Sequence, residues 1–143
     1  MIDRSGQWWT GTNAVDVEEY LRSYTEDGYP ATRFEQSRCN CGGDAFRLDA
    51  DRDEGCARRT CAACGLEHFI CDSGEYADDA TLGPVTCPCS GETFEIVVGF
   101  SHHDDGDIRW ISVGVRCVRC GVLGCPVEWK IDYAPSAELY GRA

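Results

Sequence analysis

Cysteine is the residue type in this 143-residue chain most able to do chemistry, and eight of its eleven cysteines form four close pairs. Two pairs have one residue between the cysteines and open the phrases CNCGGDAF and CPCSGETF, which begin 48 residues apart. The other two pairs have two residues between the cysteines and are followed directly by glycine. A C-x-C pair followed by a C-x-x-C-G pair therefore occurs twice, as an internal repeat. The paired cysteines are Cys39, Cys41, Cys61 and Cys64 in the first copy, and Cys87, Cys89, Cys117 and Cys120 in the second.

Two close pairs of thiolates can bind one metal ion from opposite sides, which is what a tetrahedral four-cysteine zinc site requires. The glycine after each C-x-x-C can take the backbone conformation that closes the turn. In the C-x-C pairs, residues i and i+2 of an extended chain face the same side. We therefore expect both sulfurs of each such pair to face one metal ion from a bent strand, with two structural zinc ions in all.

Short apolar runs separated by Gly and Asp clusters predict β-hairpins between the cysteine pairs. Turns are expected at 51–55 in the first copy and at 102–107 in the second. The expected strands are 45–49, a short strand leading to Cys61, and 66–71 in the first copy, and 93–100, 108–116 and 127–131 in the second.

The N-terminal segment has no cysteine and carries the pattern of one short helix. Asn13 is a suitable N-cap, and the helix should end before Asp27 and Gly28, with a proline just beyond. The predicted apolar stripe consists of Val17, Tyr20, Leu21 and Tyr24.

Cysteine pairs on turns joined by β-hairpins resemble the zinc ribbon, and the chain as a whole looks like the small tandem-ribbon proteins of bacteria. The resemblance implies closed structural sites with four protein ligands. The resulting fold class is mostly β with a short N-terminal helix and two tandem zinc-ribbon-like three-stranded units packed as a pseudo-symmetric pair. The predicted organisation is a helical segment at 1–38, repeat 1 at 39–73, an acidic connector at 74–86, repeat 2 at 87–133 and a tail at 134–143.

The formal net charge of −12 argues against general affinity for nucleic acid, which needs a basic surface. Each zinc ion with four thiolates carries −2, so two sites take the formal charge to about −16. The first ten residues show no secretory signal pattern and no run is long enough to span a membrane, so we expect a cytoplasmic protein. Reduced, spaced cysteines in that compartment favour metal over disulfides.

Several other polar residues have a structural and a functional interpretation. We expect Cys56, Cys71 and Cys125 to be small buried residues, with a Cys56–Cys71 disulfide or ligand exchange in repeat 1 as the alternatives. His68 could replace a thiol ligand of repeat 1 at most. The histidines and aspartates of 102–107 read as a solvated hairpin tip rather than a weak metal site. Four arginines near the C-x-x-C pairs should offset the thiolate charge, with contact to a phosphate or an acidic partner as the alternative: Arg58, Arg59, Arg116 and Arg119.

No catalytic motif is present, so we expect a zinc-binding protein that is not an enzyme and acts through a protein partner. Exposed aromatic residues would anchor such a partner, and the acidity would attract a basic one, as in an immunity or antitoxin-type inhibitor. The alternatives are a nucleic-acid-binding ribbon and a rubredoxin-like electron-transfer protein, because four sulfurs also suit iron. The candidate aromatic anchors are Trp8, Trp9, Trp110, Trp129, Tyr133 and Tyr140.

Overall fold

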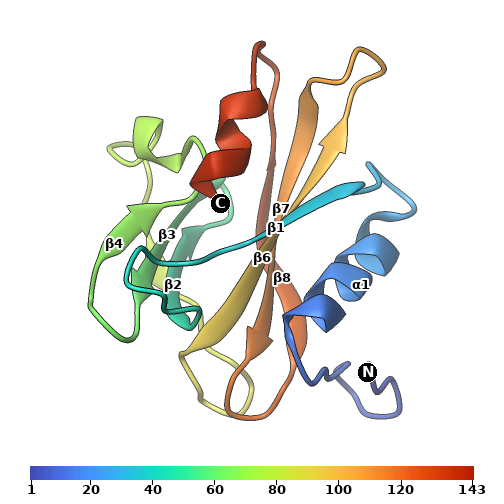
Figure 1. Ribbon diagram of the computed structural model, residues 1–143, viewed down its shortest axis with the longest axis vertical. Helices are drawn as coiled ribbons and strands as arrows, with labels where there is room; N and C mark the ends of the chain where they lie inside the picture. Colours follow the sequence, from blue (N-terminus) through green and yellow to red (C-terminus); the bar gives the residue numbers. More distant parts are fainter.

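Antiparallel strands dominate the computed structural model, which describes residues 1–143 (Figure 1). The fold class is as predicted, mostly β with one N-terminal α-helix. No helix is both long and apolar enough to cross a membrane. The elements are α1 (Ala14–Thr25), β1 (Arg33–Gln36), β2 (Phe46–Asp51), β3 (Cys56–Cys61), β4 (Glu67–Phe69), the 3-10 helix η1 (Ser73–Glu75), β5 (Gly83–Pro84), β6 (Phe94–His102), β7 (Ile108–Cys117), β8 (Leu123–Lys130) and the 3-10 helix η2 (Ala137–Arg142).

Helix α1 begins and ends where its caps predict. The Asn13 side chain accepts a hydrogen bond from the backbone N–H of Val15 at 3.0 Å, and the helix ends at Thr25. Val17 and Leu21 are fully buried against β6 and β7, but Tyr24 of the predicted stripe is 43% exposed. Half of the stripe is therefore core, Tyr20 packs partly buried against it, and Tyr24 is exposed.

Each cysteine repeat forms a three-stranded antiparallel unit, with strand order β4-β3-β2 in the first and β6-β7-β8 in the second. The two units join in a single open sheet because β2 lies beside β6, and Phe46 pairs with Phe94. These phenylalanines occupy equivalent repeat positions 48 residues apart, so an antiparallel pair between them places a local pseudo-twofold axis between the units. The predicted pseudo-symmetric pairing is confirmed, with a continuous sheet as the way the units meet.

The sheet contains two strands that the repeat pattern does not predict. Strand β1 pairs with β6 along residues 97–100, and β5 in the acidic connector pairs with β2. Strand boundaries also shift: the predicted strand 66–71 is only Glu67–Phe69, and the predicted strand 127–131 begins four residues earlier as β8. Strands β1 and β5 both depend on partner strands that are distant in the sequence.

One hydrophobic core is shared by the two units. Phe46 and Leu48 of the first pack in the same cluster as Phe94 and Val113 of the second, and all four are buried. The C-terminal residues 134–143, for which the sequence shows little pattern, form η2 and bury Leu139 in this cluster. A smaller cluster lies under α1. The units therefore stabilise each other, since neither encloses a core alone.

Candidate metal centres

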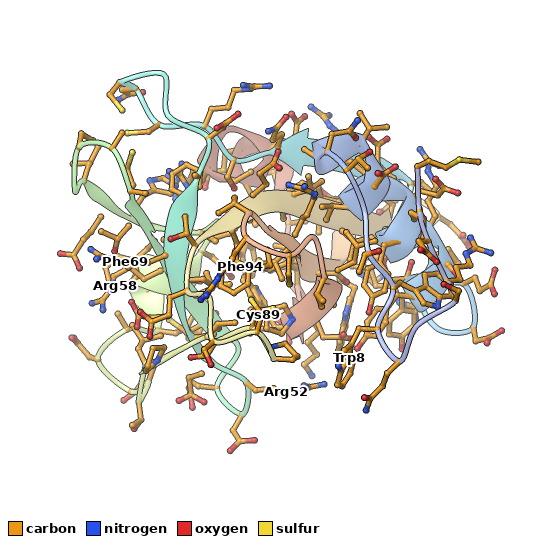
Figure 2. All side chains as sticks on the ribbon, turned by 90° about the horizontal axis from the view of Figure 1, so that it is seen from below. Trp8, Arg52, Arg58, Phe69, Cys89 and Phe94 are labelled. Carbon is orange, nitrogen blue, oxygen red and sulfur yellow. The ribbon has the colours of Figure 1, made fainter.

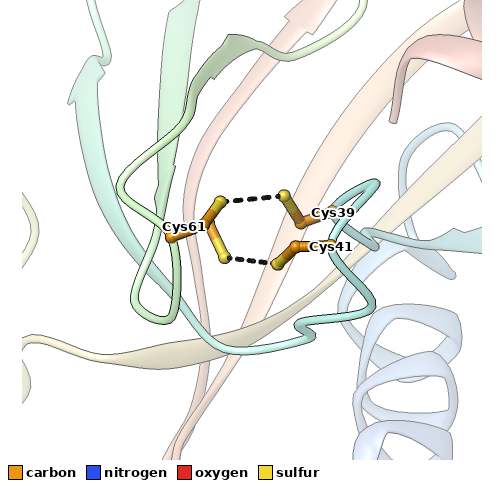
Figure 3. Close-up of side chains that lie close together, drawn as sticks. Cys39, Cys41 and Cys61 are labelled. Atoms are coloured by element: carbon orange, nitrogen blue, oxygen red, sulfur yellow. Dashed lines mark hydrogen bonds between the residues drawn. The ribbon is translucent and has the colours of Figure 1, made fainter.

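The structure brings the eight predicted cysteines together in two groups of four. In each group all four sulfurs lie within 4.8 Å of one another. The closest contacts join the two pairs: Sγ–Sγ distances are 3.5 Å for Cys39–Cys64 and 3.6 Å for Cys41–Cys61 (Figure 3). The second group repeats this pairing, at 3.4 Å for Cys87–Cys120 and 3.6 Å for Cys89–Cys117.

These distances fit one tetrahedral metal ion in each group. A Zn–S bond of about 2.3 Å requires sulfurs about 3.8 Å apart along each tetrahedral edge. The observed contacts between 3.4 and 3.6 Å are close to that value. Both groups can therefore hold a metal ion with four sulfur ligands, and such a shell leaves no open position for a substrate.

The two C-x-x-C turns have the same backbone hydrogen bonds. Gly65 N–H donates to the Cys61 carbonyl at 2.9 Å, and Gly121 N–H donates to the Cys117 carbonyl at 2.8 Å. Their φ angles are +79° and +81°, a conformation that favours glycine. The expected role of glycine after the second cysteine is thus confirmed in both copies.

The C-x-C pairs lie in tight turns, which corrects the prediction of a bent strand. Gly42 N–H donates to the Cys39 carbonyl at 2.9 Å, and Ser90 N–H donates to the Cys87 carbonyl at 2.8 Å. Gly42 and Ser90 both have positive φ, at 92° and 72°. An extended backbone would also have placed the two sulfurs on one side. The turn brings both sulfurs into one group and, in addition, reverses the chain toward the strand that follows, β2 or β6.

A glycine two residues after each C-x-C pair is needed because the sulfurs crowd the backbone. A Cβ on Gly43 would lie 2.9 Å from the Cys61 sulfur, and one on Gly91 would lie 3.1 Å from the Cys117 sulfur. These are the second glycine of CNCGG and the glycine of CPCSG, at equivalent positions. Each copy of the phrase therefore contains two candidate cysteine ligands and a glycine that leaves room for a sulfur of the opposite pair.

Backbone N–H groups favour the thiolate form at one cysteine of each group. The N–H groups of Cys64 and Ala63 lower the pKa of the Cys61 thiol to about 6. The N–H of Gly91, 3.4 Å from the Cys89 sulfur, lowers the pKa of that thiol to about 7. Thiolate is the form that binds metal, so each group contains a ligand that ionises near neutral pH.

Three of the four arginines near the C-x-x-C pairs have specific partners, whereas Arg119 is exposed. Arg58 contacts Asp49 and Glu67 at 3.3 Å, and the guanidinium of Arg116 contacts Glu95 at 2.6 Å. Arg59 is 6% exposed, lies 4.6 Å from the centre of the Phe46 ring and donates to the Ala143 carbonyl. Arg58 and Arg116 thus neutralise carboxylates rather than thiolates.

The three remaining cysteines lie outside both groups and are free. Cys56 and Cys71 are buried, and their thiols donate to the carbonyls of Ser73 and Leu139. The expectation of small buried residues is confirmed for these two, while Cys125 is only partly buried. No Cys56–Cys71 disulfide forms.

The histidines also lie apart from the sulfur groups. His68 Nε2 lies 2.9 Å from the Arg142 carbonyl. His102 is at the end of β6, between the hydroxyls of Thr32 at 3.1 Å and Tyr140 at 2.6 Å. The residues at 103–105 are exposed at the hairpin tip, as predicted. His102 therefore helps to hold the C-terminal segment, which its sequence context did not indicate.

The N-terminal segment makes a contact with the second group that the cysteine pattern does not show. Residues 9–11, here called the arm, add to the edge of the second unit: Gly11 N–H donates to the Gly121 carbonyl, and Leu123 N–H donates to the Trp9 carbonyl, each at 2.8 Å. The Arg116 Nε donates to the Gly11 carbonyl at 2.8 Å. No local signal marks the arm, because its partner lies more than 100 residues away.

Substituting alanine at Gly121 should cost about 1–3 kcal/mol more stability than the same change at Gly65. Both glycines have positive φ, so both substitutions carry the same backbone strain. Only at Gly121 would the new Cβ meet another segment, 2.7 Å from the Gly11 carbonyl oxygen, whereas Gly65 has nothing within 4 Å. Urea unfolding of the two variants measures the difference, and equal losses would contradict the close packing of the arm.

The chain was also compared with known proteins. No protein-family model, no curated protein and no solved structure matches it. The assignment of its sites therefore depends on the geometry of the sulfur groups.

Proposed function

We propose that this is a zinc-binding protein without enzymatic activity that acts by binding a basic protein partner. Two zinc ions with four thiolates each would be structural, because they leave no ligand position for chemistry. The function would then depend on a surface outside the sites. The observation that carries the proposal is an aromatic groove beside an acidic hollow.

The groove lies between α1, the segment before it, residues 85–88 and the start of β8. It has a volume of about 410 Å³. Trp8 is 50% exposed there, and the rings of Tyr20 and Tyr24 stack with centres 5.8 Å apart. Tyrosine and tryptophan are enriched where proteins bind one another. The other apolar side chains lining the groove are Val85, Cys87, Pro88, Phe94, Val115, Val122, Leu123, Cys125 and Pro126.

An acidic hollow adjoins this groove, and Arg52 lines both. Figure 2 shows Trp8 and Arg52 along the same side of the molecule. Two tryptophans, Trp110 and Trp129, form part of the wall of the hollow. Two cations, Arg52 and Lys130, and five carboxylates line the hollow, although Asp72 is buried and accepts hydrogen bonds from Trp129 and Tyr133. The carboxylates are Asp53, Glu54, Asp72, Glu128 and Asp132.

An apolar groove that continues into a carboxylate-lined hollow suits a partner with an apolar anchor next to basic side chains. The net charge of −12 would attract such a partner over a longer range. An immunity or antitoxin-type inhibitor of a basic enzyme is one protein of this kind. Nucleic acid binding is disfavoured because Arg58 and Arg116 are already paired with carboxylates.

Electron transfer is a second candidate because the sulfurs are accessible. Cys41, Cys64 and Cys120 are exposed, so an iron ion in either group would lie near the surface. The absorption spectrum of the purified protein separates the two candidates, because zinc is colourless and oxidised iron in a four-sulfur site is red.

Reversing two charges of the hollow should abolish partner binding at low salt. We expect tagged protein carrying Asp53→Lys and Asp132→Lys to lose the protein captured by the unmodified chain, and Trp8→Ala with Tyr24→Ala to lose it as well. Matched controls are Asp78→Lys with Asp79→Lys in the exposed connector, and Val15→Ala on the outer face of α1, which is 68% exposed. Absence of any partner, or equal loss in the controls, would overturn the proposed surface.

A further inference from the structure

The two C-x-x-C-G turns are equivalent in sequence and backbone, but only one of them is covered. Gly121 and Leu123 in the second unit are buried, whereas Gly65, Leu66 and Glu67 in the first are exposed. Leu66 is 53% exposed, the largest exposure of any leucine, isoleucine or phenylalanine in the chain. The cover on the second unit is the arm, and nothing in the chain takes its place on the first.

The uncovered edge has the same backbone hydrogen-bonding groups that the arm uses. Cys61 N–H donates to the Leu66 carbonyl, so the next pair, Thr60 and Glu67, is a non-hydrogen-bonded pair. The N–H of Glu67 therefore points away from β3, as the N–H of Leu123 does where it donates to Trp9. The Gly65 carbonyl corresponds to the Gly121 carbonyl, which accepts from Gly11.

We propose that the edge at Gly65–Glu67 is a docking site for an extended segment of a partner protein, which adds as a short antiparallel strand. This inference rests on the proposed partner-binding function and adds a second contact to it, of the strand-addition type. The arm on the second unit shows the geometry: antiparallel pairing, with a glycine next to the turn.

The occupant has to come from another protein because the chain's own arm is already in use. Three hydrogen bonds hold residues 9–11 at the second unit. A second copy could donate its arm only by uncovering its own Gly121 edge, which would lose three hydrogen bonds and gain only the two backbone bonds that the Gly65–Glu67 edge offers. A partner segment has no such loss.

The Gly65–Glu67 edge should bind an extended segment more weakly than the Gly121 edge binds the arm, because one side chain differs between the two units. The guanidinium of Arg116 donates to the Gly11 carbonyl and is held by Glu95. The equivalent positions in the first unit are Thr60 and Arg47, which pair with each other in register. At the position of Arg116, a guest strand on the first unit therefore meets only the short hydroxyl of Thr60 and not a charged guanidinium that reaches its matching carbonyl.

A peptide with the sequence of residues 2–13 is the probe, tested on the zinc-loaded protein by nitrogen-15 NMR. At about 1 mM peptide, we expect the amide signals of Leu66 and Glu67 to shift and exchange of the Glu67 amide to slow. The same peptide methylated on the nitrogen of its glycine equivalent to Gly11 should have no effect, because it cannot donate to the Gly65 carbonyl. No change at 65–67, changes confined to Gly121 and Thr10, or the same changes on raising protein concentration without peptide would overturn the proposal.

A double variant offers a gain of binding rather than a loss. Arg47→Glu with Thr60→Arg recreates the Glu95–Arg116 pair and supplies a charged donor, so we expect the peptide to bind roughly tenfold more tightly. Unchanged affinity in a folded double variant would contradict the equivalence of the two edges. The peptide experiment needs no natural partner, so its failure would leave the groove proposal standing, and failure of the capture experiment would not affect the peptide result.

Discussion

Replacing Cys61 and Cys64 by serine should release one of two bound metal ions and unfold most of the chain. Both sulfurs belong to the first group, and Cys61 is also the last residue of β3 and pairs with Phe46. Structural zinc sites contribute on the order of 10 kcal/mol to folding, more than the core of a chain of this size can replace. A chelator that removes both metal ions from the unmodified protein should likewise unfold most of the chain.

Metal analysis and circular dichroism measure the two parts of this result. The matched control is Cys56→Ser, since Cys56 lies outside both groups and a serine hydroxyl can also donate to the Ser73 carbonyl. We expect that variant to keep two metal ions and its strand spectrum. A folded Cys61→Ser, Cys64→Ser variant with two metal ions would exclude the first group as a metal site.

Substituting alanine for Phe46 or Phe94 should destabilise the whole protein by about 3–5 kcal/mol in each case. Phe46 is fully buried and Phe94 is 2% exposed, and their pairing is the only register contact between β2 and β6. Each ring therefore packs in a core to which both units contribute. The two losses should be similar, because the positions are equivalent about the pseudo-twofold axis.

Urea unfolding followed by tryptophan fluorescence and by circular dichroism tests both the size and the cooperativity. Phe69→Ala is the control, because Phe69 is a phenylalanine on the edge strand β4 that is only partly buried. We expect a single coincident transition by both signals in every variant. Two separate transitions would show that the units fold independently, and the shared core would then not be the main source of stability.

The features that the sequence alone predicts correctly are those that depend on residues close together in the chain. The spacing of the cysteines and the glycines after them led to the two groups of four sulfurs, since two or three residues of backbone decide whether two thiols can reach one ion. Asn13 and the Asp27-Gly28 pair were sufficient for the bounds of α1, and the period of Val17 and Leu21 for its buried face. The hairpins followed from Gly and Asp clusters between apolar runs.

The C-x-C turn marks the limit of this local reasoning. Extended and turn conformations both place the two sulfurs on one side, so the spacing of Cys39 and Cys41 does not distinguish them. The choice depends on Gly42 and Ser90 at positive φ, which close the turn in each copy. Serine is not a residue whose type predicts that conformation, although glycine at the equivalent position is a signal that could have been used.

Only the tertiary structure decided how the two units meet and which surfaces stay open. The pairing of Phe46 with Phe94, the addition of β1 to β6 and the burial of Leu139 each join segments far apart in the chain. Such contacts depend on the shape and apolar area that the complete fold offers, and no short pattern encodes them. The same holds for the arm: the repeat predicts two equal turns, but tertiary packing covers Gly121 and leaves Gly65 exposed.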